Sequence, residues 1–201
     1  GYSELVAENM VYSGGLKIYA TIDTKVQDAL DSVYTDDSAF PNTEKYGEVP
    51  ESAMVITDKQ GNIVGIAGGR GEKTSSRGFS YASDARRQPG SSIKPLATYG
   101  PAMDAGIATP DTTVYDRALI QDADGNPWPM NDGKYPTGRA MTVKEGMTRS
   151  LNTISAQLLK QLTPQKSYEF MTQQLGFKLV DSRTNEDGTV QSIVDKYITA
   201  G

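Results

Sequence analysis

The chain has 201 residues, neither histidine nor cysteine, and a formal net charge of −5 at pH 7. Without these two residue types it can form no Ser-His-Asp triad, no thiolate nucleophile and no ordinary zinc site. Its mild acidity, with no basic stripe carrying interleaved aromatic residues, argues against nucleic-acid binding, and no apolar run approaches the ~18 residues of a membrane span. The length suits one domain, and a Ser–Lys pair is the common acyl-transfer device that this composition leaves.

The N-terminal part is predicted to begin with a strand at residues 15–22, where apolar and polar side chains alternate. Asp23 or Thr24 then caps a predicted helix. The apolar positions of this helix are Val26, Ala29, Leu30 and Val33. Residues 35–51 are polar and rich in turn formers, so we expect a loop there.

A hairpin is predicted next, from residues 53–58 and 62–67 around the turn Asp58-Lys59-Gln60-Gly61. Because both segments are almost continuously apolar, we expect both faces of the hairpin to be buried. The glycine-rich segment from Gly68 to Arg77 is predicted to be a mobile linker. It lacks the Gly-x-x-x-x-Gly-Lys-Ser/Thr spacing of a phosphate-binding loop.

A nucleophile and a base come together in the segment Arg87-Gln88-Pro89-Gly90-Ser91-Ser92-Ile93-Lys94-Pro95. Side chains three residues apart share one face of a helix, so the Lys94 amine can reach the Ser91 hydroxyl and remove its proton during attack. Pro89 and Gly90 suit a tight approach to a first helical turn. Taken alone, the same spacing also fits an N-cap serine followed by a solvated lysine.

A second motif favours the catalytic interpretation. Ser150-Leu151-Asn152 is the only Ser-x-Asn in the chain, and it lies between two predicted helices. The first of these helices opens with Thr142-Val143-Lys144-Glu145, a capping-box pattern. The second has its apolar residues at helical spacing, namely Ile154, Leu158, Leu159 and Leu162.

From residue 91 onward the pattern is mostly helical, with a Gly/Pro/Asp-rich excursion over residues 107–141 and a later helix start at Thr163-Pro164. Pro101 is expected to kink or end the helix that carries Ser91, because proline removes one backbone donor. Strands first and helices later indicate an α+β fold.

These motifs together resemble the transpeptidase domain of class A penicillin-binding proteins, the bifunctional enzymes that polymerise and cross-link bacterial peptidoglycan. The extended string Arg-Gln-Pro-Gly-Ser-Ser-x-Lys-Pro is typical of class A and far more specific than Ser-x-x-Lys. Residues 15–23 are similar to the first strand of the family and the start of its first helix, and residues 53–69 to the hairpin before the nucleophile. The resemblance covers the chain from near residue 12 to the C-terminus.

The resemblance implies an α+β fold of the penicillin-binding protein and serine β-lactamase type, here incomplete, with the first strands of an antiparallel sheet and the helical subdomain. We expect a single partial transpeptidase domain over residues 1–201. Its expected parts are a lead-in (1–14), a strand-helix-hairpin part (15–69), a linker (70–90) and a mainly helical part that bears both motifs (91–201).

One motif of the family is absent from the sequence. No Lys-Thr-Gly or Lys-Ser-Gly occurs, and the nearest string, Lys73-Thr74-Ser75, lacks the glycine and precedes the nucleophile. In the family this third motif lies well downstream of Ser-x-Asn, so we expect it beyond Gly201. The chain is accordingly expected to be an N-terminal portion of a transpeptidase domain and to be inactive by itself.

The resemblance also implies residue roles. Ser91 would attack the penultimate D-alanyl carbonyl of a stem peptide, and Lys94 would accept the proton of Ser91. Ser150 would relay a proton to the leaving amine, and Asn152 would bind the substrate amide and help to orient Lys94. A second stem peptide would then displace the acyl-enzyme to close a cross-link. No metal or organic cofactor is called for.

The implied partners are stem peptides ending in D-Ala-D-Ala and β-lactam antibiotics, with no nucleic acid. The resemblance places the protein at the extracytoplasmic face of the bacterial cell membrane, with the anchor and a glycosyltransferase domain upstream of this chain. A non-catalytic penicillin-sensing module, an inactive fragment and a D,D-carboxypeptidase stay open as alternatives. A β-lactamase would need a positioned deacylating glutamate, for which the sequence offers no convincing candidate.

Overall fold

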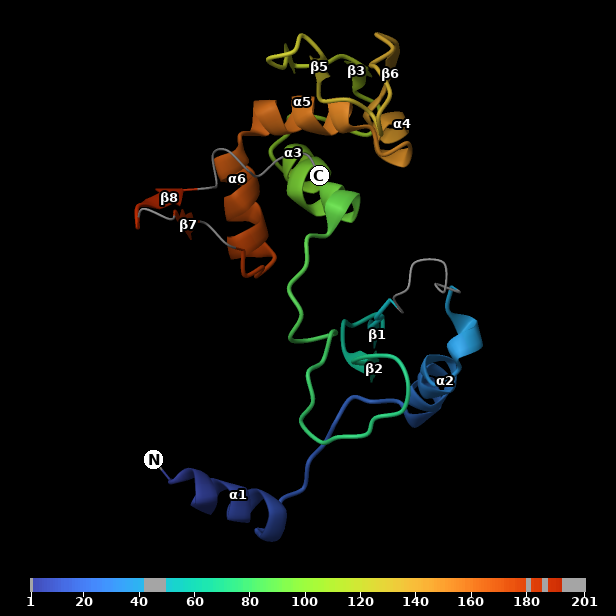
Figure 1. Cartoon of the computed structure of the whole chain (residues 1–201), viewed down its shortest axis with the longest axis vertical. Coiled ribbons are helices and arrows are strands. Elements are labelled where there is room, and N and C mark those ends of the chain that lie inside the picture. The colour runs from blue at the N-terminus through green and yellow to red at the C-terminus, as the bar shows by residue number, and fades with distance from the viewer. Residues whose placement is uncertain (1, 42–49, 180–181, 186–187, 193–201) are drawn as a thin grey trace. The chain divides into compact units, whose positions relative to one another are not determined.

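The computed structural model describes residues 2–41, 50–179, 182–185 and 188–192 (Figure 1). The elements in chain order are α1 (Glu4–Ser13), α2 (Thr24–Tyr34), the 3₁₀ turn η1 (Asp37–Ala39), β1 (Met54–Thr57), β2 (Ile63–Ala67), the 3₁₀ turn η3 (Gly90–Ile93), the π-helical turn η4 (Pro95–Tyr99), α3 (Gly100–Asp104), β3 (Thr113–Tyr115), β4 (Ile120–Gln121), β5 (Pro127–Trp128), β6 (Ala140–Thr142), α4 (Val143–Thr148), α5 (Asn152–Leu162), α6 (Pro164–Glu169), the π-helical turn η5 (Phe170–Gln174), β7 (Ser182–Thr184) and β8 (Val190–Ser192).

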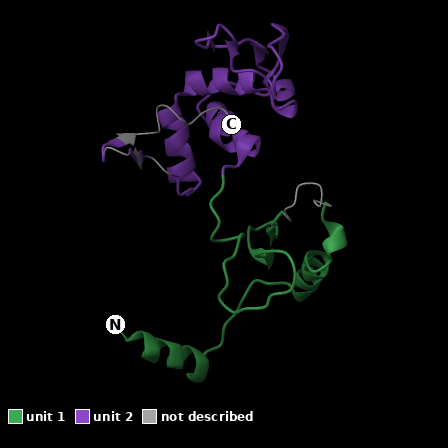
Figure 2. Ribbon diagram, viewed as in Figure 1, with its two compact units in different colours: residues 1–87 green, residues 88–201 purple. Residues whose placement is uncertain are grey.

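The chain divides into two compact units, residues 1–87 and residues 88–201 (Figure 2). The strands described form two-stranded antiparallel pairs, β1 with β2 in the first unit and β3 with β6, β4 with β5 and β7 with β8 in the second. Helices and small antiparallel sheets together confirm the predicted α+β class.

In the first unit, α2 packs on the β1–β2 hairpin. Asp23 caps α2 by accepting from the backbone N–H groups of Lys25 and Val26, as the sequence predicts. The side-chain amide of Gln27 then pairs with the backbone of Ile66 in β2, accepting from its N–H at 2.9 Å and donating to its carbonyl oxygen at 3.0 Å. The buried core of this unit is Leu30, Tyr34 and Ala67, with Phe40 and Ile56 packed against it.

The strand predicted at residues 15–22 does not form. Residues 15–23 have no regular secondary structure, and Ile18 and Tyr19 are 81% and 89% exposed. A strand needs a neighbour to complete its ladder, and contact with β2 begins only where Thr21 donates to the Ile63 carbonyl oxygen and the Asp23 N–H to that of Val64. The alternation of apolar and polar residues over 15–22 is therefore typical of a strand, but no neighbouring strand in the described part of the chain pairs with it.

The hairpin itself is confirmed, with Met54 opposite Ala67 and Val55 opposite Ile66. The expectation that both its faces are buried is wrong. Val55 is exposed on the face opposite the one that packs on α2. Met54, opposite Ala67 on the covered face, and Ile63 are exposed as well. Continuous apolar character cannot distinguish a strand covered on two faces from one covered on a single face.

Arg70, at the start of the predicted linker, is fixed in the first unit. Its side chain is 9% exposed, and its guanidinium donates to the Pro50 carbonyl oxygen and to Asp37, each at 3.0 Å. The same group lies 4.2 Å from the centre of the Phe40 ring. Mobility is therefore the wrong expectation for this residue.

The second unit is organised around α5. Its predicted apolar face is confirmed, since Ile154, Leu158, Leu159 and Leu162 are all buried. The main core of the unit joins α5 to the elements before it through Tyr99, Ala102, Ala108, Val114, Met141, Val143 and Leu151. The predicted helix starts are also confirmed, because Thr142 caps α4 and Thr163 caps α6 through their hydroxyl oxygens.

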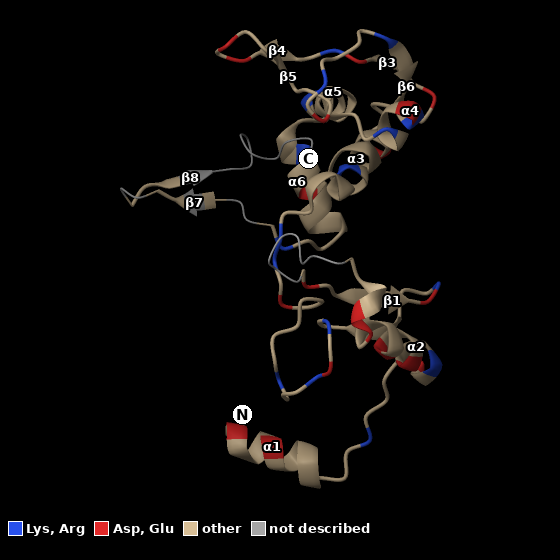
Figure 3. Cartoon of the chain, turned by 45° about the vertical axis from the view of Figure 1, so that its right-hand side comes forward, with Lys and Arg blue, Asp and Glu red and all other residues tan. Residues whose placement is uncertain are grey.

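The excursion over residues 107–141 contains two strand pairs that the sequence analysis did not predict. β3 pairs with β6 from Thr113 opposite Thr142 to Tyr115 opposite Ala140, and β4 pairs with β5 (Figure 3). Each of these strands has only two or three residues. Strands this short show no measurable periodicity, so only their pairing across the chain defines them.

The predicted helix that begins at Ser91 is broken into three pieces, η3, η4 and α3. Pro95 and Pro101 have no backbone N–H, so a continuous series of i to i−4 hydrogen bonds through this segment is impossible. Pro101 lies in the first turn of α3, directly after the π-helical turn η4, and Tyr99 and Gly100 before it have helical backbone angles, so Pro101 does not end the helix.

The helices described here are short. None of those in the described ranges is long and apolar enough to cross a membrane. Acidic and basic side chains are interspersed along the chain, and the charged residues of α1 are the two acidic ones, Glu4 and Glu8 (Figure 3).

Candidate active site

Ser91 lies in the 3₁₀ turn η3 on the exposed surface of the second unit. The turn starts from Gly90, whose φ of +60° is a left-handed value that glycine adopts without strain. The neighbouring Ser92 uses its hydroxyl to donate to the Pro89 carbonyl oxygen at 2.8 Å. Ser92 thus stabilises the turn, whereas the side chain of Ser91 makes no hydrogen bond to Lys94 in this structure.

Lys94 is buried, with 3% of its surface exposed. Its Nζ donates to the Ser150 backbone carbonyl oxygen at 2.9 Å, to the Ser150 hydroxyl at 3.3 Å and to Asn152 Oδ1 at 2.5 Å. The fold therefore brings three of the four predicted site residues together around one amine. A solvated lysine, the alternative that the sequence left open, does not describe this side chain.

Burial lowers the pKa of Lys94 from its ordinary value, because a charged amine loses hydration in the interior of the protein. A lower pKa increases the fraction of neutral amine, which is the form that can accept a proton. A neutral amine has two N–H groups where an ammonium has three. Only two of the three contacts can then receive an N–H, and the Ser150 hydroxyl is the one that can adjust, because a hydroxyl can donate as well as accept.

Ser150 occupies the junction between α4 and α5 with a φ of +53°, a left-handed conformation that costs energy for any residue with a Cβ. Two backbone hydrogen bonds of 2.9 Å maintain the junction, from the Ser150 N–H to Met147 and from the Leu151 N–H to Gly146. The close approach of α4 to α5 depends on Gly146, since a Cβ there would lie 2.9 Å from two carbons of Ile154.

Asn152 is the first residue of α5. Its side-chain oxygen faces Lys94, while its Nδ2 donates to the Met130 carbonyl oxygen at 2.9 Å. The side-chain nitrogen has a second N–H, which this bond leaves available for a substrate carbonyl. Asn152 can therefore orient the amine and contact a peptide at the same time.

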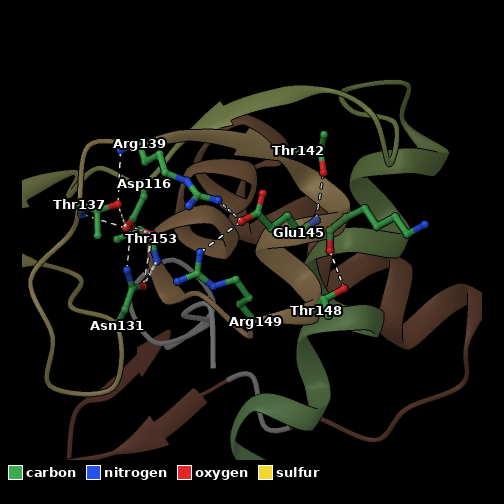
Figure 4. A network of polar contacts seen from close by, with 10 residues as sticks. Asp116, Asn131, Thr137, Arg139, Thr142, Glu145, Thr148, Arg149 and Thr153 are labelled. Atoms are coloured by element: carbon green, nitrogen blue, oxygen red, sulfur yellow. Dashed lines mark hydrogen bonds and ion pairs between the residues drawn. The ribbon is translucent and has the colours of Figure 1, made fainter.

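A buried polar cluster that the sequence did not predict includes Thr153, the residue after Asn152 (Figure 4). The Asp116 carboxylate, 2% exposed, accepts from the Asn131 side chain, from the Thr153 hydroxyl and from both the backbone N–H and the hydroxyl of Thr137, at 2.7 to 2.9 Å. Burial alone would raise the pKa of Asp116, but these hydrogen bonds outweigh it and hold the pKa below its ordinary value. An aspartate in a Gly/Pro/Asp-rich stretch carries no sequence signal of such burial.

The capping box predicted at Thr142 is only half formed. The Glu145 backbone N–H donates to the Thr142 hydroxyl at 3.1 Å, but the Glu145 carboxylate pairs with Arg139 and Arg149 (Figure 4). Both arginine side chains are about half exposed, at 62% and 48%, so these pairs contribute little to stability. In the ranges that the structure describes, no group of three or more acidic side chains could hold a metal ion.

The family to which the chain belongs is shown by its sequence. The family described as penicillin binding protein transpeptidase domain matches residues 51–196. This chain is a member of the penicillin-binding protein transpeptidase family. It is 34% identical over 170 residues to penicillin-binding protein 1A of Clostridium acetobutylicum, covering 78% of this chain and 21% of that protein. It is 33% identical over 195 residues to penicillin-binding protein 1A of Clostridium tetani, covering 91% of this chain and 24% of that protein.

The fold agrees with this membership. The structure matches penicillin-binding protein 1A from Haemophilus influenzae with a TM-score of 0.57 and 17% sequence identity, over 96% of this chain and 44% of that one. The family resemblance and the α+β transpeptidase-type fold inferred from the sequence are thereby confirmed. The chain spans less than a quarter of the length of the two clostridial penicillin-binding proteins.

Proposed function

We propose that the chain carries the nucleophile and proton-transfer residues of a serine D,D-transpeptidase that cross-links peptidoglycan stem peptides. The single observation that supports this most strongly is the buried Lys94 amine, which contacts both Ser150 and Asn152 one helical turn after Ser91. A lysine without a role in the site could keep its amine in solvent and avoid the free-energy cost of desolvation. The membership in the transpeptidase family supplies the reaction class.

In the proposed reaction, Ser91 Oγ attacks the penultimate D-alanyl carbonyl carbon, and its proton passes to neutral Lys94. When the tetrahedral intermediate collapses, the C–N bond breaks, Ser150 passes its proton to the leaving D-alanine amine, and Ser150 takes up the proton that Lys94 had received. The amine of a second stem peptide then attacks the acyl-enzyme, forms the cross-link amide and returns the proton to Ser91. The free N–H of Asn152 binds the substrate amide.

The remaining parts of the proposal concern the whole protein. The family's third motif is absent from the 201 residues, so we propose that it completes the site from elsewhere in the protein and that these residues acylate poorly without it. β-Lactams would acylate Ser91 in place of the stem peptide. We place the reaction at the extracytoplasmic face of the bacterial membrane, with a glycosyltransferase domain in the same protein.

The test is covalent labelling of the full-length protein with a fluorescent penicillin, followed by mass spectrometry of the labelled peptide. We expect the label on Ser91 and its loss in Ser91→Ala. The matched control is Ser92→Ala, which removes the hydrogen bond to Pro89 but retains the nucleophile, and should keep the label. A label that survives in Ser91→Ala overturns the assignment.

A second measurement separates the reaction classes. Unlabelled protein is incubated with a D-Ala-D-Ala stem peptide and an amine acceptor, and its products are compared with the result of penicillin labelling. D-alanine release with a new amide bond supports the transpeptidase, whereas release with hydrolysis alone indicates a carboxypeptidase. Penicillin labelling without any release of D-alanine indicates a sensing module.

A further inference from the structure

The orientation of the Asn152 side chain is set by two neighbours, one a hydrogen-bond donor and the other an acceptor. Its oxygen accepts from Lys94, and its nitrogen donates to the Met130 carbonyl oxygen. If the amide rotated by half a turn, its NH₂ group would face the donors of Lys94 and its oxygen would face the oxygen of Met130. The Met130 carbonyl therefore selects the rotamer in which Asn152 can hold Lys94.

Met130 follows β5 and lies outside the strand ladders. The residue after it, Asn131, is anchored on both sides of its side-chain amide. Its Nδ2 donates to Asp116 Oδ1 at 2.7 Å, and its Oδ1 accepts from the backbone N–H of Thr153 at 3.2 Å. Thr153 is the next residue after Asn152, so Asn131 connects Asp116 to the start of α5 (Figure 4).

Asp116 is suited to this position because it accepts hydrogen bonds from four donors and donates none. Oδ1 receives Asn131 and Thr153, and Oδ2 receives the backbone N–H and hydroxyl of Thr137. An asparagine has the same shape but places an NH₂ group where one oxygen was. The Thr137 and Asn131 nitrogens cannot become acceptors, so either orientation of that asparagine leaves two donors facing each other.

We infer that Asp116 is a positioning residue for acylation. It fixes Asn131, which fixes the Met130 carbonyl, which fixes the Asn152 amide with its oxygen toward Lys94. This inference rests on the proposed function of Ser91 and Lys94. It adds a buried carboxylate that touches neither substrate nor nucleophile and acts only through Asn152.

The experiment is a double-mutant cycle in the full-length protein, with Asp116→Asn, Asn152→Ala and the double variant. The rate constant of acylation by penicillin is separated from initial binding by its dependence on penicillin concentration. We expect Asp116→Asn to lower the acylation rate constant about ten-fold, because small displacements of a reacting group are costly, while initial binding changes by less than about two-fold. In the Asn152→Ala background the same substitution should change the rate constant by less than about two-fold.

A general loss of stability gives a different result. Leu162→Ala removes a buried side chain at the far end of α5 and should lower the unfolding temperature while preserving the acylation rate constant below the transition. The inference is overturned if Asp116→Asn lowers the rate constant by less than about three-fold, or if its full effect persists with Asn152→Ala. If Asp116→Asn does not fold, Thr137→Val, which removes one hydroxyl donor to Asp116, is compared with Thr137→Ser under the same criteria.

Failure of the proposed function gives a separate signature. A wild-type protein that takes no label on Ser91 would end the proposed function. Hydrogen exchange of the backbone over residues 130–137 needs no catalysis and is measured in parallel. Faster exchange there and at Thr153 in Asp116→Asn supports the structural half of the inference, and unchanged exchange overturns it.

Discussion

Lys94 binds Ser150 twice, at its backbone carbonyl oxygen (2.9 Å) and at its hydroxyl (3.3 Å), across 56 residues of sequence. The two oxygens differ in whether they can also donate a hydrogen bond. A carbonyl oxygen only accepts, so it needs an N–H of Lys94 in either protonation state. A hydroxyl can reverse, so it is the contact that adjusts when the amine becomes neutral. Ser150 is thus placed to exchange a proton with Lys94.

The first prediction concerns the pH dependence of acylation. Because burial lowers the pKa of Lys94 below its ordinary value of 10.5, the neutral base should appear at lower pH than in an exposed lysine. The acylation rate constant should rise with pH and level off above the pKa of Lys94, with its midpoint below pH 10.5. Stopped-flow measurement with a chromogenic β-lactam checks this, and a midpoint at 10.5 or higher contradicts it.

Lys94→Arg tests the same role by a different route. Arginine keeps the positive charge but cannot act as a base at accessible pH. We expect acylation to fall by about 10²–10⁴, the usual contribution of general-base catalysis. Circular dichroism of the variant shows whether the fold is retained, and a folded variant with a near wild-type rate would refute the base assignment.

The second prediction compares Ser150→Gly with Ser150→Ala. Both remove the hydroxyl, but alanine keeps a Cβ at a φ of +53° and glycine does not. The left-handed conformation costs about 1–2 kcal/mol per residue with a side chain, so we expect the glycine variant to be about 1 kcal/mol more stable to unfolding. Urea denaturation measures the difference. Equal stability would show that the junction relaxes on loss of the hydroxyl.

The third prediction is that Gly146→Ala destabilises the second unit. Alanine is favoured over glycine by about 1 kcal/mol inside a helix, but overpacking typically costs about 1–3 kcal/mol. The new Cβ would lie 2.9 Å from two carbons of Ile154, so the clash should dominate, with a net loss of up to about 2 kcal/mol. Because α4 and α5 flank Ser150, acylation should fall as well.

Its control is the double variant with Ile154→Ala, which removes two of the three atoms that the new Cβ would meet. The double variant should lose less stability than the sum of the two single variants, because each change relieves the other. Additive losses would mean that the contact between α4 and α5 is not the cause.

The fourth prediction concerns Arg70 and Asp37 in the first unit. The Asp37 side chain is 91% exposed, so Asp37→Ala should cost less than about 1 kcal/mol. Arg70→Lys loses the planar contact with Phe40 and one of two directed hydrogen bonds from a side chain that is 9% exposed, and should cost about 1–3 kcal/mol. Thermal unfolding of both variants decides the order, and a larger loss for Asp37→Ala would reverse the interpretation.

Local patterns in the sequence correctly predicted the elements whose signals lie within a few residues. The cap of α2, the hairpin turn, the cap of α4 and the apolar face of α5 are all of this kind. Each depends on a hydrogen bond or a periodicity within one or two turns of the chain. The strand expected at residues 15–22 was wrong because a strand depends on a neighbour that lies elsewhere.

For the candidate site too, some features follow from the sequence and others only from the tertiary structure. The spacing of Ser91 and Lys94, the Ser-x-Asn motif and the family resemblance are properties of the sequence, and their roles stay predictions until labelling is done. The tertiary structure decided which groups surround Lys94, how Asn152 is turned and that Asp116 is buried. Burial, hydrogen-bond partners and the resulting pKa shifts depend on residues that are far apart in the sequence and come into contact only on folding. A local sequence pattern therefore cannot predict them.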